Sequence, residues 1–209
     1  MKRFLFLALT LVLTLALVSC GNKEEKQKEF TLGVVDGTTY TSDFAGIGIN
    51  LGLGWNFYTK DQIKQMNNFI GKSDEEISTA LESASVVVDM LAYDVSSNNV
   101  SVIFEKSDTA DLKKLSLDDI MDNSYEGFLE SISSANPTVV EKNTEVIKLC
   151  DRDMGCLKVT VSIPNEQVGV VTMYTTLLVF KCENYLVSIG INTYGNDGSA
   201  DVISNIFSK

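Results

Sequence analysis

Residues 168–192 read VGVVTMYTTLLVFKCENYLVSIGIN, and this stretch decides the fold. Residues 168–181 and 185–192 are rich in β-branched and aromatic side chains, which favour strands. Only a short turn at Glu183 and Asn184 separates the two runs. Strands joined by so short a turn must be antiparallel, so the stretch predicts a hairpin within an antiparallel sheet.

The sequence on the N-terminal side extends this pattern. Further strands are expected at residues 30–35, 38–42, 47–53, 86–95, 100–106, 138–141, 145–150 and 156–163. Helices, each with a capping residue or an apolar stripe at helical spacing, are expected at residues 59–70, 73–84, 116–135 and 199–207. Because the helices come in blocks and do not alternate with strands, we predict an α+β fold, an antiparallel β-sheet flanked by helices. Residues 30–209 would form one domain.

The order of these elements resembles a known family. An early strand ends at Gly54 and Trp55, the long helix carries Tyr125 and Leu129, and the last strand reads YLVSI at residues 185–189. A short final helix would carry Ile203, Ile206 and Phe207. This arrangement resembles the Mog1/PsbP-like α/β/α sandwich of small secreted bacterial lipoproteins. The resemblance implies an accessory or binding module, and it transfers no catalytic residue to this chain.

The N-terminus predicts a destination outside the cytoplasm. Lys2 and Arg3 precede the uncharged run at residues 4–18, which is shorter than the roughly 20 apolar residues that span a membrane. Residues 1–19 therefore read as a signal peptide. The quartet Leu17-Val18-Ser19-Cys20 resembles the bacterial lipobox, which implies a diacylglyceryl group on Cys20 and a cell-membrane anchor facing the extracytoplasmic side. Residues 20–29 would be the lipidated N-terminus and a polar tether. The alternatives are a signal anchor and a signal peptide that is cleaved at another position.

Charge and composition exclude several function classes. The chain has 17 basic and 28 acidic residues, a net charge of −11. Removing residues 1–19 takes away Lys2 and Arg3 and makes the net charge −13. Because so acidic a domain is repelled by nucleic acid and by anionic lipid, we expect no nucleic-acid partner and attribute membrane association to the lipid alone. The chain has no histidine, which removes the Ser-His-Asp and Cys-His nucleophile systems and the commonest zinc ligand.

Three cysteines remain once Cys20 is assigned to the lipid. Strand alternation places Cys150 and Cys156 on the same face, at the two ends of a predicted five-residue turn. Such positions can lie opposite each other at a separation that a disulfide accepts, and an extracytoplasmic address permits oxidation. We therefore expect a Cys150–Cys156 disulfide with Cys182 free. The alternative is three reduced thiols.

Candidate binding residues are few. Trp55, Phe57 and Tyr58 could form an aromatic platform that faces a ligand, although aromatic residues at a strand end also commonly close a core. Asp151 and Asp153 could bind calcium, but their spacing is common, Arg152 opposes it, and a solvated turn is the preferred interpretation. No metal site, catalytic residue or cofactor other than the lipid on Cys20 is expected.

The sequence therefore favours a non-catalytic binding or accessory module anchored in the cell envelope. Its partner would be a protein, an envelope component or a small molecule. One alternative is a hydrolase-like enzyme that uses carboxylates such as Asp118, Asp119 or Glu126. Another is a structural component of an envelope complex.

Overall fold

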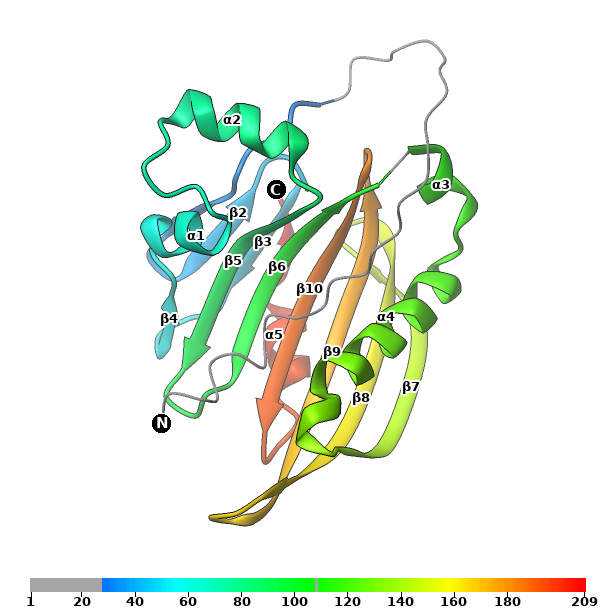
Figure 1. The fold of residues 1–209 in the computed structure, drawn as a ribbon. Coiled ribbons are helices and arrows are strands. Elements are labelled where there is room, and N and C mark those ends of the chain that lie inside the picture. Colours follow the sequence, from blue (N-terminus) through cyan, green and yellow to red (C-terminus); the bar gives the residue numbers. More distant parts are fainter. Residues whose placement is uncertain (1–27, 108) are drawn as a thin grey trace.

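A seven-stranded antiparallel sheet forms the centre of the molecule. The computed structural model describes residues 28–107 and 109–209, so Cys20 and the predicted signal peptide lie outside the described residues. The strand order is β4-β5-β6-β10-β9-β8-β7. The strands are β4 (Trp55–Phe57), β5 (Val86–Asp94), β6 (Asn99–Lys106), β7 (Thr138–Leu149), β8 (Arg152–Asn165), β9 (Gly169–Cys182) and β10 (Tyr185–Tyr194). Figure 1 shows the long β8–β9 hairpin projecting beyond the neighbouring strands.

A second, four-stranded sheet packs on one face of the large sheet. Its order is β1-β2-β3-β11, with β1 (Val34–Asp36), β2 (Thr39–Ser42), β3 (Ile47–Asn50) and β11 (Ile206–Ser208). The sequence pattern assigned Ile206 and Phe207 to the final helix, and that assignment is wrong. The helix α5 (Ser199–Ser204) ends earlier, and Ile206 pairs with Ile49 in β3.

Helices pack on both faces of the large sheet. The helix α4 (Leu117–Ile132) begins at a capping box between Ser116 and Asp119, and it lies across β8 and β9 on the face opposite the small sheet (Figure 1). The helix α1 (Lys60–Met66) packs on β5, and the remaining helical segments are α2 (Asp74–Ser83), α3 (Thr109–Lys114) and the 3-10 turn η2 (Ser133–Ala135). Within the described ranges, no helix combines the length and the apolar character needed to cross a membrane.

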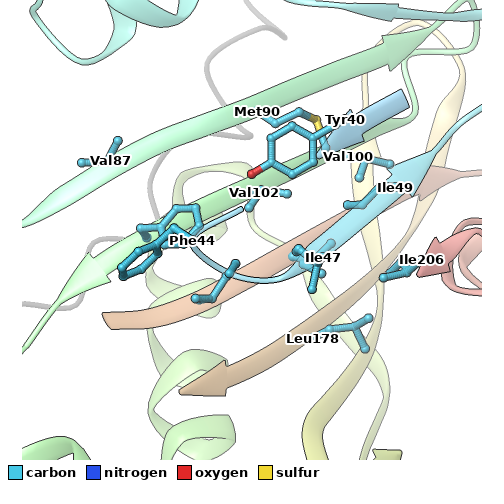
Figure 2. Close-up of a cluster of buried hydrophobic side chains, with 14 of the residues drawn as sticks. Tyr40, Phe44, Ile47, Ile49, Val87, Met90, Val100, Val102, Leu178 and Ile206 are labelled. Atoms are coloured by element: carbon cyan, nitrogen blue, oxygen red, sulfur yellow. The ribbon is translucent and has the colours of Figure 1, made fainter. Parts of the chain in front are cut away.

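The main core lies between the two sheets. Tyr40, Ile47 and Ile49 of the small sheet are completely buried, and Figure 2 shows them facing Met90, Val100 and Val102 of the large sheet. Burying one such aliphatic side chain contributes about 1.5–3 kcal/mol to folding. This shared core makes the small sheet an integral layer of the domain.

The hairpin between β7 and β8 corrects the disulfide prediction. The two strands pair up to Leu149 and Arg152, so the turn consists of Cys150 and Asp151 alone. Glu145, and not Cys150, lies opposite Cys156. Cys156 lies four positions along β8 from Arg152, roughly 13 Å, and Cys150 lies in the turn beyond Arg152, so the two cysteines exceed the ~7 Å limit for a disulfide. Cys150, Cys156 and Cys182 are free thiols in this structure.

Candidate functional site

A pocket of about 600 Å³ opens beside the small sheet. Four parts of the chain enclose it: the segment that leads into β1, the junction of β4 with α1, the helix α2 and the middle of β5. The wall is largely apolar and includes Phe30, Leu32, Phe57, Ile63, Ile77 and Leu81. Pockets that bury drug-sized ligands have volumes of this order.

A β-bulge brings a carboxylate to this pocket. In the pairing of β5 with β6, Val88 faces Ile103 and Met90 faces Val102, so Asp89 is the extra residue. A bulge of this kind turns the extra side chain away from the regular ladder. Asp89 lines the pocket and is only 5% exposed, so it is a buried acid at an apolar site.

Two neutral donors hold the Asp89 carboxylate. The backbone N–H of Gly33 donates to Oδ1 at 2.8 Å and to Oδ2 at 3.0 Å. The hydroxyl of Tyr40 donates to Oδ2 at 2.6 Å. Burial raises the pKa of Asp89 to about 6, although both hydrogen bonds act in the opposite direction. Burial and the nearby Asp89 also raise the pKa of Tyr40, which keeps its hydroxyl protonated as the donor.

Charged side chains at the pocket mouth pair with one another. Lys60 and Lys64 lie 3.6 Å and 3.5 Å from Asp74 Oδ1. Asp74 and Lys60 both line the pocket and are largely exposed. Exposed ion pairs of this kind contribute little to stability, and Asp89 is the buried carboxylate of the site.

The predicted aromatic residues divide between the pocket and the core. Phe57 and Tyr58 line the pocket, whereas Trp55 does not. Trp55 pairs with Asp94 at the sheet edge and packs against the main core, as the alternative interpretation expected. The role of Phe57 and Tyr58 as ligand contacts stays a prediction.

The carboxylates of the hydrolase alternative lie elsewhere. Asp118, Asp119 and Glu126 are exposed on α4 and line neither the pocket of about 600 Å³ nor the smaller hollow described below. Asp119 closes the capping box, and its hydrogen bonds from Ser116 lower its pKa. This carboxylate therefore caps a helix. Nowhere in residues 28–107 and 109–209 do three or more acidic or cysteine side chains gather as a metal site would require.

A smaller hollow of about 80 Å³ lies on the opposite face of the large sheet, beside α4. Thr175 donates to Asn192 at 2.7 Å, and Asn192 donates to Asn99 at 2.9 Å. These three side chains of the hollow therefore form a hydrogen-bonded chain. Burial raises the pKa of Glu105 at its rim to about 7. The hollow is too small for more than a few atoms, which makes the larger pocket the better candidate site.

The sequence interpretation missed Asp89 and its two donors. One signal was present, because Asp89 interrupts the apolar run VVVDMLAY at residues 86–93. A lone acid in a strand buried on both faces is unusual and indicates a specific partner or a site. Gly33 and Tyr40 carried no such signal, since their meeting with Asp89 depends on how the two sheets pack.

Comparison with solved structures places this fold among known ones. CyanoP, the cyanobacterial PsbP of Synechocystis sp. PCC 6803, aligns with a TM-score of 0.50 at 14% identity, over 90% of this chain and 98% of CyanoP. LpqN of Mycobacterium tuberculosis, described as involved in cell envelope biogenesis, aligns with a TM-score of 0.44 at 10% identity, over 77% of this chain and 82% of LpqN. A Bacteroides thetaiotaomicron protein aligns with a TM-score of 0.43 at 11% identity, over 84% of this chain and 49% of that protein.

The likeness to CyanoP shows that the chain has a PsbP-like fold. The predicted α+β class, with antiparallel strands flanked by helices, is therefore confirmed. At 14% identity the likeness shows the fold alone. The sequence matches no protein-family model and no curated protein.

Proposed function

We propose that this chain is a lipid-anchored, extracytoplasmic accessory module that binds a small, largely apolar molecule and performs no catalysis. The observation that carries the proposal is the pocket of about 600 Å³ beside Asp89. Its apolar walls would remove a ligand from water, and each square ångström of apolar surface buried contributes about 25 cal/mol. A few polar groups in such a pocket fix a ligand's orientation.

The anchor is the second part of the proposal. The lipobox-like quartet at residues 17–20 supports it, and the first described residues, Lys28 and Glu29, are the last two of the expected tether. Two acyl chains anchor stably where a single chain binds only reversibly. The binding pocket would therefore stay near the membrane surface, where apolar molecules concentrate.

Binding is tested with octan-1-ol, a neutral apolar probe, followed by NMR of the Ile77 and Leu81 methyl groups. Ser78 lines the pocket from α2, so S78W should fill the pocket and abolish the methyl shifts. Ser83 is exposed on the same helix and does not line the pocket, so S83W is the matched control and should leave binding unchanged. Equal binding by both variants, or no binding by the parent protein, would contradict the proposal.

The anchor is tested in the full-length chain made in a bacterial host. Growth with a labelled fatty acid should label the parent protein and place it in the membrane fraction. C20S should lose the label and leave the membrane. A labelled C20S protein would overturn the assignment of the lipid to this cysteine. Turnover of any compound in a substrate panel by the purified domain would contradict the absence of catalysis.

A further inference from the structure

We propose that the pocket selects apolar molecules that carry a protonated amine, with the Asp89 carboxylate as the counter-ion. This inference rests on the proposed function and names the ligand class of the same site. The ammonium would lie against Asp89, and the apolar body would lie against the wall formed by Phe57, Ile77 and Leu81.

The first argument is that Asp89 has no cation of its own. Its two hydrogen-bond partners, Gly33 and Tyr40, are neutral donors. None of the ion pairs found in residues 28–107 and 109–209 includes Asp89. A buried carboxylate without a positive partner is costly, and a cationic ligand would offset that cost.

The second argument is that the carboxylate retains capacity for another donor. A carboxylate offers roughly four lone-pair directions. Oδ2 accepts from Tyr40 and shares the Gly33 N–H, whereas Oδ1 has only that shared N–H. An ammonium brings three N–H donors, and a charge-assisted bond to Oδ1 would be stronger than one from a neutral hydroxyl.

The third argument is the charge around the pocket. Tyr58 reaches the pocket from the junction of β4 with α1, Lys60 from the start of α1 and Asp74 from α2, and Tyr40 reaches Asp89 from β2. Lys60, the lysine that lines the pocket, is paired with Asp74 at the mouth, and Lys64, which shares that carboxylate, does not line the pocket. The net charge of −11 adds an attractive field for cations.

The experiment compares octylammonium, octan-1-ol and octanoate, which share one apolar chain and differ in the head group. At pH 7.5 we expect octylammonium to bind at least tenfold more tightly than octanol, and octanoate to bind more weakly than both. Octanol binding alone tests the proposed function, so the two proposals can fail separately. Equal affinity for all three probes would leave the pocket a binding site but overturn the amine preference.

Two matched variants locate the preference. D89N should abolish the difference between octylammonium and octanol while leaving octanol binding in place. D61N removes an exposed carboxylate of α1 that does not line the pocket, and it should leave the preference intact. A preference lost in D61N and kept in D89N would overturn the assignment to Asp89.

The pH dependence of binding tests the same preference in the parent protein, so this test remains valid even if D89N fails to fold. The pKa of Asp89 is raised to about 6, so lowering the pH from 7.5 to 5.0 protonates it. The affinity for octylammonium should then fall about tenfold, because the counter-ion is lost, while octanol binding stays constant. An octylammonium affinity that does not change over this range would contradict the proposal.

Discussion

The Tyr40 hydroxyl donates to Asp89 Oδ2 over 2.6 Å and thereby ties the small sheet to the bulge in the large sheet. Both residues are buried, and the bond joins β2 to β5 across the interface of the two layers. The bulge would otherwise place an acid in an apolar interior with the Gly33 N–H as its only donor. The same contact therefore stabilises the fold and forms one side of the candidate site.

The stability of the protein should fall as the pH rises from about 4 to about 6. The pKa of Asp89 is raised from 3.8 to about 6, so in this window the folded chain holds a proton that the unfolded chain has released. By linkage the free energy of unfolding decreases across the window, by up to about 3 kcal/mol. Urea denaturation at pH 4.5 and 7.5 measures the change.

D89N is the control for this pH dependence. It should lose the part of the change that is due to Asp89, whereas E105Q should retain it. Asp43, Glu76 and Asp119 have lowered pKa values, so their effect on the pH dependence of stability has the opposite sign. They are present in every variant, so their contributions cancel when the variants are compared. A D89N protein with the same pH dependence as the parent would contradict this prediction.

Y40F should destabilise the domain by about 2 kcal/mol at pH 7.5, because it removes a buried hydrogen bond to a charged acceptor. It should also raise the pKa of Asp89 further, since the Tyr40 hydroxyl lowers that pKa. NMR titration of the Asp89 carboxyl carbon measures the second effect. Y93F is the matched control, because Tyr93 is 45% exposed and should change neither quantity by a measurable amount.

G33A should destabilise the domain by about 1–3 kcal/mol through overpacking. A Cβ on Gly33 would lie 2.4 Å from Tyr40 Cε2 and 2.8 Å from the Thr41 carbonyl oxygen, and the buried Tyr40 ring has no room to move. G198A is the control, because its Cβ would meet Thr193 Cγ2 at an ordinary 3.4 Å. Thermal denaturation compares the two, and equal melting temperatures would show that the Gly33 site can relax.

The three described cysteines should differ in their reactivity. Burial raises the pKa of each thiol, so alkylation at neutral pH should be slow. Cys156 is 1% exposed and should react only after unfolding, whereas the half-buried Cys150 and Cys182 should react in the folded protein. Mass spectrometry of a C20S protein, alkylated before and after denaturation, measures this. A non-reduced mass two daltons below that of three thiols would contradict the free-thiol assignment.

Local signals predicted much of the fold. Each of the two capping boxes, one at Ser73 and one at Ser116, spans only four residues. The structure places a helix start at both. The β9–β10 hairpin of the opening stretch likewise depends on neighbouring residues, and its strands pair from Cys182 and Tyr185 outward. These features could be predicted because the interactions that fix them are close in sequence.

Features that depend on distant partners could not be predicted in this way. The apolar spacing of Val202, Ile203, Ile206 and Phe207 fits one helix, and only the open edge of β3 makes the last part a strand. Cys150 and Asp151 both adopt left-handed backbone angles in a two-residue turn, which Asn-Gly signals but Cys-Asp does not. Likewise, Phe57 and Tyr58 could be identified as candidates from their position, whereas the meeting of Asp89 with Gly33 and Tyr40 depends on the packing of two sheets.

The pairing of β3 with β11 has a consequence for the speed of folding. Ile49 and Ile206 come from opposite ends of the described chain, and the whole seven-stranded sheet lies between them in sequence. Closing so long a loop has an entropic cost before its contacts form, and topologies rich in such distant contacts fold slowly. A chain that lacks residues 206–208 would leave the backbone groups of β3 unpaired on one side, an edge that invites association with other strands. The pairing of β3 with β11 should therefore be among the last contacts to form, and the small sheet is complete only at that late step.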